Sequence, residues 1–522
     1  MSRARIYARN LTANWVGYSV NLAVIFFMSP FVVHTLGEVN YGVWSLMVSM
    51  TGYLGLVEMG TRAGIGRYIN FYLGKQDIRS VNAIISTGMA MIVAIGVLLL
   101  LAGLLLAATL HWIFPKIPTE LVPTARIVAV LIAVNLWMGF LSSPFRQVLT
   151  AHERFELTNA VDLVVLAFRT VATIAALVHG YGLLTLAWIH FGGNVLGQLC
   201  VQVLARRVFP SLSIRPWRAS RRRMRELFGF SVWAFIGAVG TRLRSGASTL
   251  VIAILLGPQW VTYYVIGSML LYKTRHVVTN CTSIFNPKMV QDCARGDFAA
   301  LRVQFRQGNN LAMVIGILMF VGMIAFGREF IILWMGPRFE ISYSVLAILA
   351  SSSLVAVAFS LIGPIYQGLN RVRLKALWTL ATGVLQIGAS LTFVLGFDWG
   401  ILGVVWARFL VVIIFHVVLG LLAMNWIGIT PGYFFRTVAV RWLLLIGLFY
   451  GVCLAINLMP VPSNWGTFFA KVAVATAIYL PLSWSILLDD QTKLRLRTAL
   501  TGRIRALTEG RAVGKAVSDF RA

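Results

Sequence analysis

Long apolar runs recur along the whole chain and are separated by short polar or basic segments. Fourteen of these runs come near the roughly 20 residues that an α-helix needs to cross a bilayer. They lie at residues 11–35, 42–72, 83–110, 123–149, 159–179, 183–205, 229–255, 260–285, 304–335, 343–366, 377–396, 401–424, 438–459 and 467–488. The pattern predicts an all-α polytopic membrane protein with about 14 transmembrane helices. The long runs 42–72 and 304–335 are expected to bend or to enter the interface.

Composition favours a polytopic protein over a soluble domain with a membrane anchor. Of the 522 residues, 59% are hydrophobic and 12% are charged, and the mean hydropathy is +0.82. A soluble domain carries roughly 25% charged residues. The first apolar run follows a basic N-terminus and has no small-residue cleavage site, so we expect a retained helix and not a signal peptide.

The net charge of +28 is concentrated in a few basic segments. These are Arg3, Arg5 and Arg9; Arg206, Arg207, Arg215, Arg218, Arg221, Arg222, Arg223 and Arg225; and Lys493, Arg495, Arg497, Arg503, Arg505, Arg511, Lys515 and Arg521. The positive-inside rule places such segments in the cytoplasm. We therefore expect a multi-pass protein of the cytoplasmic (inner) membrane with both termini in the cytoplasm. The basic segments would contact anionic lipids and not nucleic acid.

The chain repeats itself at an offset of about 220 residues. Gly37 matches Gly257 and Asp77 matches Asp297, each pair 220 residues apart. Several matches at one offset predict two six-helix repeats of the same orientation, with a cleft between them. The predicted organisation is an N-terminal lobe (1–205), a basic cytoplasmic linker (206–228), a C-terminal lobe (229–425), helices 13 and 14 (426–488) and a basic amphipathic cytoplasmic tail (489–522).

Several charges lie inside apolar runs, where a central charge costs about 2.5–3.5 kcal/mol. They are Glu58, Arg62, Arg67, Arg242, Arg244, Lys273, Arg275 and His276. Glu58 and Arg62 are four residues apart and could simply neutralise each other. Arg67 is expected to reach the interface along its own stem. One carboxylate cannot neutralise all of these cations, so the surplus predicts an anionic partner, and arginine forks suit phosphate oxygens.

Other polar residues in the runs favour structural roles. Asp162 and Arg169 would pair with each other or with neighbouring helices, and His190 would be a hydrogen-bonded core residue. Arg408, at the corresponding position of the second repeat, would line a cavity of that half. Asn21 could hydrogen-bond a sugar or merely another helix.

No motif indicates an enzyme. The chain has no Walker A loop, no nucleotide-binding glycine fingerprint and no HExxH. Its four cysteines are scattered without metal-ligand spacing. We expect no catalytic residue, no metal site and no cofactor.

The opening of the chain resembles the prokaryotic polysaccharide-transport family. The features that match are Asn14, Pro30, Leu36-Gly37, Tyr41-Gly42 and the segment that ends at Gly74. This family contains the Wzx-type flippases of lipid-linked oligosaccharides, within the superfamily that also includes the multidrug and toxin extrusion (MATE) transporters. The likeness extends in pattern over roughly residues 5–425 and identifies the family better than the substrate.

The resemblance implies two six-helix lobes in a V-shaped, MATE-like arrangement, plus two C-terminal helices as in the fourteen-helix lipid II flippases. By that analogy, the cations that converge on the central cleft would be Arg62, Arg242, Arg244, Lys273 and Arg275. The leading hypothesis is a flippase that moves an undecaprenyl-pyrophosphate-linked oligosaccharide from the cytoplasmic to the outer leaflet. It would work by alternating access, for synthesis of a surface polysaccharide such as O-antigen or exopolysaccharide.

In this hypothesis the five cations bind the pyrophosphate and Asn21 and Tyr272 contact sugar, while Glu58 and His276 are candidates for proton or ion coupling. The expected partners are the polyprenyl-linked oligosaccharide, anionic lipids, a polysaccharide polymerase and glycosyltransferases, and the protein would be a monomer. Two alternatives remain open. A MATE-type cation-coupled drug antiporter would need more acidic residues in its cavity, and a membrane scaffold for glycosyltransferases would depend on residues 489–522.

Overall fold

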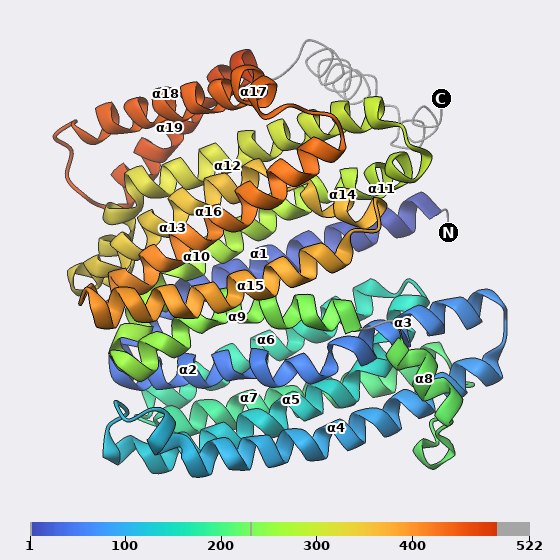
Figure 1. Ribbon diagram of the computed structural model, residues 1–522. Coiled ribbons are helices and arrows are strands. Elements are labelled where there is room, and N and C mark those ends of the chain that lie inside the picture. The colour runs from blue at the N-terminus through green and yellow to red at the C-terminus, as the bar shows by residue number, and fades with distance from the viewer. Residues whose placement is uncertain (1–2, 230–231, 488–522) are drawn as a thin grey trace, which may run out of the picture. The chain divides into compact units, whose positions relative to one another are not determined.

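The computed structural model describes residues 3–229 and 232–487, without the side chains of residues 3–15, 57–60, 62, 63, 218, 226, 228, 229 and 232–234. Within these ranges all regular structure is helical (Figure 1). The elements are α1 (Arg3–Leu36), α2 (Glu38–Leu54), η1 (Gly55–Glu58), α3 (Met59–Gly74), α4 (Ile78–Ile113), η2 (Thr119–Leu121), α5 (Val122–Ala151), α6 (Phe155–Val178), α7 (Leu183–Val208), η3 (Pro216–Arg218), α8 (Arg221–Gly229), α9 (Val232–Leu255), α10 (Pro258–Thr282), η4 (Ser283–Phe285), α11 (Asn286–Arg295), α12 (Phe298–Met335), η5 (Pro337–Phe339), α13 (Glu340–Ala358), α14 (Ile362–Gly368), α15 (Val372–Leu391), η6 (Thr392–Gly396), α16 (Gly400–Trp426), α17 (Pro431–Phe434), η7 (Phe435–Ala439), α18 (Val440–Asn457) and α19 (Trp465–Ile486).

Each of the predicted spans coincides with a helix or with consecutive helices. In the described part of the chain, 11 helical segments are long and apolar enough to cross a membrane: Val16–Leu36, Ile78–Ile113, Thr119–Ala151, Phe155–Val178, Leu183–Val208, Phe298–Met335, Pro337–Ala358, Val372–Gly396, Gly400–Trp426, Pro431–Asn457 and Trp465–Ile486. The predicted spans outside this set correspond to α2–α3, α9 and α10, which carry the mid-membrane charges. The all-α polytopic fold is confirmed, and the count of about 14 crossings stays a prediction.

The predicted span 42–72 bends, as expected. Helix α2 ends at Leu54, a single 3₁₀ turn follows at Gly55–Glu58, and α3 begins at Met59. Glycine costs a helix interior about 1 kcal/mol relative to alanine, so Gly52 and Gly55 weaken the helix at this junction. The other long run behaves differently, because α12 continues unbroken over 38 residues. A 3₁₀ turn inside a span often marks a hinge or a functional site.

The internal repeat is visible in the backbone. Gln76 and Gly296 are 220 residues apart, and both have a positive φ, of 56° and 72°. The residue that follows each one caps a long helix: Asp77 begins α4 and Asp297 begins α12, and each carboxylate accepts from a backbone N–H at 3.0 Å. Further pairs with positive φ are 217 to 220 residues apart, namely Gly37 and Gly257, Glu153 and Asn370, and Gly180 and Asp398. The duplicated sequence therefore makes the same turns twice.

The chain divides into two compact units. The first, called here the N-unit, comprises residues 6–266 and 372–411, and the second, the C-unit, comprises the described parts of residues 1–5, 267–371 and 412–522. Helix α15 belongs to the N-unit because it packs along α9 (Figure 1). The predicted lobes 1–205 and 229–425 stay a prediction.

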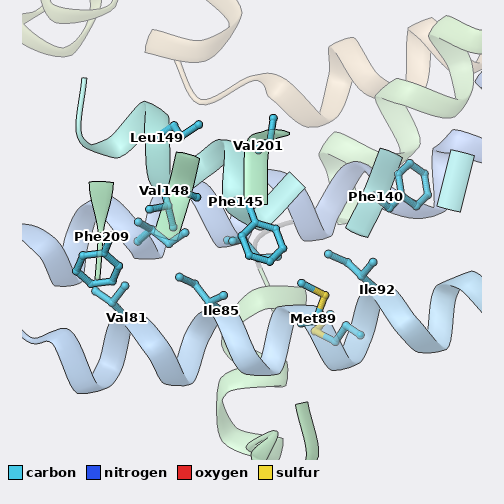
Figure 2. Packing of buried hydrophobic residues seen from close by; sticks show 14 of the residues in the cluster. Val81, Ile85, Met89, Ile92, Phe140, Phe145, Val148, Leu149, Val201 and Phe209 are labelled. Atoms are coloured by element: carbon cyan, nitrogen blue, oxygen red, sulfur yellow. The ribbon is translucent and has the colours of Figure 1, made fainter. Parts of the chain in front are cut away.

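The N-unit has a core in which α4 packs on α5 and α5 packs on α7. Figure 2 shows Val81, Ile85 and Ile92 on the side of α4 that faces this core, where all three are fully buried. Their spacing of four and seven residues places them on one helix face. Phe145 of α5 and Val201 of α7 complete the contact. Between membrane helices such close packing stabilises by van der Waals contact, because lipid is as apolar as the side chains.

The C-unit joins the last two helices to α12 through polar contacts. Trp442 of α18 donates from Nε1 to Oδ1 of Asn310 at 2.9 Å, and Tyr479 of α19 donates to the carbonyl of Val314 at 2.6 Å. The ring of Tyr479 also packs at a tilt against that of Phe449, with ring centroids 4.5 Å apart. The predicted helices 13 and 14, which correspond to α18 and α19, therefore pack on α12 as part of the C-unit.

The basic linker predicted at 206–228 is a folded part of the N-unit. Asn82 of α4 donates to the carbonyl of Ser211 at 2.8 Å and accepts from the N–H of Ser213 at 3.1 Å. The N–H of Arg215 donates to Ser86 Oγ at 2.9 Å. Side chains of α4 thus hydrogen-bond the backbone N–H and C=O groups of the linker and hold it against the helix.

The linker ends in α8, which is amphipathic. Leu227 is buried in the N-unit core, and Arg223 hydrogen-bonds the hydroxyl of Tyr72 and Ser80 Oγ. Trp217, just before α8, is 80% exposed. The loop therefore has one face docked on α3 and α4, while its exposed arginines and Trp217 remain accessible.

Candidate functional site: cations on α9

Arg242 lies midway along α9, where its guanidinium reaches α2. Its Nη2 donates to the carbonyl of Ser49 at 2.7 Å, and its Cζ lies 5.2 Å from the centroid of the Tyr53 ring. Both described partners are neutral, so neither compensates the positive charge of the guanidinium. The arginine is held in one position and can present its remaining donors to an anion.

Gly52 provides the space that this guanidinium occupies. A Cβ atom built on Gly52 would lie only 1.6 Å from Nη2 of Arg242, so any larger residue there would displace the side chain. Gly55, one turn later, has nothing within 4 Å of the same hypothetical atom. The glycine at position 52 therefore has a steric role that the glycine at 55 lacks.

Arg244, two residues beyond Arg242, has a cationic neighbour on another helix. Arg244 acts electrostatically on the ammonium group of Lys375, which is half-buried near the start of α15. Helices α9 and α15 lie side by side (Figure 1) and approach closely at Gly240 and Gly383. Like charges held together in a membrane protein raise the local positive potential, which favours binding of an anion.

Lys375 was missed by the sequence reasoning. It stands in a short basic stretch that reads as a loop before an apolar run, and nothing in that stretch signals its neighbour on α9. The structure therefore places Lys375 of α15 near Arg244, whereas Arg242 reaches α2 from another side of α9. These three cations, which lie around α9, are called here the α9 cation cluster.

Glu58 and Arg62 lie on η1 and α3, which both pack against α9 within the N-unit. Their side chains lie outside the described residues, as does that of Asn14, so their predicted roles stay predictions. Arg67 is exposed and lies over the ring of Tyr68, with 5.8 Å between Cζ and the centroid.

The other predicted site residues lie on α10 and α1. Lys273 and Arg275 are half-buried, His276 is exposed and hydrogen-bonds Asn280 at 3.0 Å, and Tyr272 is 44% exposed. All four belong to the C-unit, whereas the α9 cation cluster and Asn21, which is half-buried on α1, belong to the N-unit. The convergence of these residues on one cleft stays a prediction.

Two further charged residues have structural partners, as expected. Asp162 pairs with Arg146 of α5 at 2.8 Å, and Arg169 donates to Oδ1 of Asn194 on α7 at 2.6 Å, so each pairs with a neighbouring helix. His190 packs its ring against Trp44, with centroids 4.8 Å apart.

Arg408 is buried in the N-unit. It donates to the carbonyl of Ser245 at 3.0 Å and to the hydroxyl of Tyr264 at 2.7 Å, and thereby links α16 to α9 and α10. These contacts indicate that Arg408 holds helices together. Among the side chains described, no cluster of His, Cys, Asp and Glu could hold a metal ion.

A sequence model of a family described as "Polysaccharide biosynthesis protein" matches residues 7–283, more than half of the 522-residue chain. The chain is also similar to "Uncharacterized membrane protein EpsK" of Bacillus subtilis (strain 168), with 23% identity over 391 residues, 73% of this chain and 76% of that protein.

Two solved structures show the same fold. The lipid II flippase MurJ in an inward closed conformation is 12% identical with a TM-score of 0.72, and the similarity covers 91% of this chain and 98% of MurJ. An inward-facing multidrug resistance MATE family transporter of the MOP superfamily is 14% identical with a TM-score of 0.65, covering 78% of this chain and 94% of that one. At these identities the likeness shows architecture alone, and it agrees with the MATE-like fold expected from the sequence.

Proposed function

Because the chain belongs to the polysaccharide biosynthesis protein family, we propose that it flips an undecaprenyl-pyrophosphate-linked oligosaccharide from the cytoplasmic to the outer leaflet of the inner membrane. The observation that carries this proposal is the α9 cation cluster, with Arg242 oriented by neutral partners. A pyrophosphate diester is an anion that cannot enter hydrocarbon unaided. Guanidinium groups bind phosphate oxygens in a bidentate manner, and the bonds are roughly twice as strong as neutral ones.

The proposed cycle begins with the cleft open to the cytoplasm, where both chain termini and the basic linker would lie. Arg242 and Arg244 bind the pyrophosphate with Lys375, while Lys273, Arg275 and Arg62 add charge if the cleft brings them near. The sugar occupies the hydrated interior, and the polyprenyl chain stays in lipid. Rocking of the two repeats then opens the cleft to the other side.

The membrane potential supplies a driving force for this direction. An anion that leaves a negative cytoplasm gains about 2.3 kcal/mol per charge per 100 mV. A substrate with two negative charges therefore needs no obligatory ion exchange, although coupling through Glu58 or His276 stays compatible with the proposal.

The test is export of surface polysaccharide in a strain whose own gene is replaced by variants. Loss of two charge-assisted bonds, at about 1.5–3 kcal/mol each, should weaken pyrophosphate binding by at least about 100-fold in the variant R242A/R244A. We expect export to fail, lipid-linked intermediate to accumulate, and the protein level in the membrane to stay normal.

A glycine pair provides a matched control that leaves every charge in place. G52A should displace the guanidinium of Arg242 and reduce export, whereas G55A adds the same methyl group to open space and should export normally. Normal export in both R242A/R244A and G52A would refute the role of the cluster. Accumulation of a lipid without pyrophosphate would refute the substrate class.

A further inference from the structure

A cationic pocket in the C-unit is lined by none of the residues assigned above. It is a cavity of ≈ 460 Å³ between the beginning of α12 and the segment that connects α16 to α17. Arg302 and Arg306 are in its lining, four residues apart and therefore on one face of α12. The hydroxyl-bearing residues Thr430 and Tyr433 also line it. The described lining contains no Asp or Glu.

The geometry holds one arginine in position. Nη1 of Arg302 donates to the carbonyl of Ile427 at 3.1 Å. Gly428 has φ +72°, and a Cβ built on it would lie 3.1 Å from the same nitrogen, so only glycine combines this turn with such a close approach. The guanidinium thus uses one N–H donor to bind the protein backbone, and its side chain lines the pocket with further donors.

The remainder of the lining is apolar. Val303 is exposed on the wall, and Phe305, Phe434 and Val438 are buried behind it, with 6.4 Å between the two ring centroids. A wall of this kind beside two guanidinium groups suits a ligand that is anionic at one end and hydrocarbon at the other. A soluble anion would use only the cationic end.

The position of the pocket fits such a ligand. It lies where α12 begins and where α16 has ended, which is the level of the lipid head groups in a polytopic protein. At the opposite end of α12, Arg328 pairs with Glu340 at 2.8 Å and Glu329 pairs with Lys471 at 3.0 Å. The pocket end carries Arg302 and Arg306 without an acidic residue in the described lining, and the positive-inside rule favours the cytoplasmic side for such an end.

We propose that Arg302 and Arg306 form a site for the phosphate of an anionic membrane phospholipid, with Val303 and the ring of Tyr433 against its glycerol and upper acyl carbons. The lipid joins the start of α12 to the α16–α17 connection from the cytoplasmic leaflet. This site is distinct from the one proposed for the transported substrate, because none of the pocket residues belongs to the α9 cation cluster. The predicted consequence is that anionic lipid stabilises the C-unit.

The test uses the full-length protein in detergent and native mass spectrometry with phosphatidylglycerol or phosphatidylcholine. R302Q/R306Q should weaken the tightest phosphatidylglycerol binding by at least about tenfold. The control K116Q/R126Q removes the same charge from two exposed residues that lie outside the basic segments and should change it less than about twofold. Phosphatidylcholine should bind much more weakly to the unaltered protein.

A second variant keeps the result decisive if the double arginine variant does not fold. A299W places a large ring at the pocket while leaving both arginines, and it should also weaken phosphatidylglycerol binding. If inorganic phosphate displaces phosphatidylglycerol from the unaltered protein but not from R302Q/R306Q, the phosphate site is supported. The site would then accept a soluble anion as well as a lipid. Equal losses in R302Q/R306Q and K116Q/R126Q, or unchanged binding in A299W, would overturn the proposal.

Discussion

The contact between α9 and α15 makes a sharp prediction about two glycines of α9. A Cβ built on Gly240 would lie 2.5 Å from the backbone nitrogen of Leu380, whereas a Cβ built on Gly237 would lie 3.7 Å from its nearest neighbour on α15, Cβ of Ala376. The two glycines are three residues apart and both face the same partner helix. G240A should therefore destabilise the protein, and G237A should not.

The size of the effect follows from these distances. Carbon contacts are optimal near 3.5–4.0 Å, so the backbone atoms would have to move by about 1 Å to accept the G240A methyl group. Overpacking of this kind costs about 1–3 kcal/mol. The intrinsic gain from replacing glycine by alanine in a helix, about 1 kcal/mol, is common to both variants and cancels between them. The difference corresponds to about a 5- to 150-fold change in the ratio of folded to unfolded protein.

The assay compares the two variants in the same detergent. Heat-induced loss of the monodisperse peak in size-exclusion chromatography ranks their kinetic stability, because membrane proteins seldom unfold reversibly. Export is measured in parallel, since α9 carries Arg242 and Arg244 and a displacement of this helix moves both. We expect a lower midpoint and reduced export for G240A alone.

An equal midpoint for G240A and G237A would refute the reasoning, because it would mean that α9 and α15 do not approach as closely as described. A lower midpoint with normal export would retain the packing argument. It would, however, separate the position of the helix from the function of its arginines.

Three other features lead to shorter predictions. K471M should lower the free energy of unfolding by up to about 3–5 kcal/mol, because it removes the ammonium group that pairs with the largely buried carboxylate of Glu329. E329Q/K471M should recover much of this loss in the same chromatographic assay. The pKa of Asp77 is lowered because its carboxylate accepts hydrogen bonds, first from the Ser80 side chain and then from the Ser80 backbone N–H. The ionised cap therefore stabilises the protein fully above the ordinary Asp pKa of about 3.9. This stabilisation is lost as the pH falls through the lowered pKa of the folded protein. D77N should keep a helix cap whose strength does not depend on acid pH. Identical heat stability of D77N and the unaltered protein at every pH from neutral to acid would contradict this prediction. N82A removes two hydrogen bonds to the linker, worth about 1 kcal/mol each. Limited trypsin digestion should therefore cleave the linker several-fold faster. An unchanged cleavage rate would show that these hydrogen bonds do not control the opening of the linker.

Much of the fold could be predicted from sequence because a bilayer imposes strict lengths. Each predicted span coincides with a helix or with consecutive helices in the described part of the chain. The duplication was also correctly read, since the residues at matching positions cap the same helices and make the same left-handed turns.

The candidate site was only partly predictable. Arg242 and Arg244 stand out in sequence because a charge in an apolar run is costly and therefore informative. Lys375 does not stand out, because it lies at the beginning of its helix, where a lysine is common. Only the packing of α15 on α9 brings it close to Arg244. The pocket at Arg302 and Arg306 likewise depends on a connection more than 120 residues later, whose carbonyl at Ile427 orients one guanidinium.

By itself the sequence determined that this is an all-helical membrane protein and that its halves are related, and it predicted an anionic partner for the cations within the apolar runs. The physical reason is that span length, periodicity and the cost of a charge in lipid are local properties of the chain. Tertiary structure alone decided which cations become neighbours, which glycine makes room for Arg242, and that the basic linker docks on α4. These depend on contacts between residues far apart in sequence, and no local pattern encodes such distances.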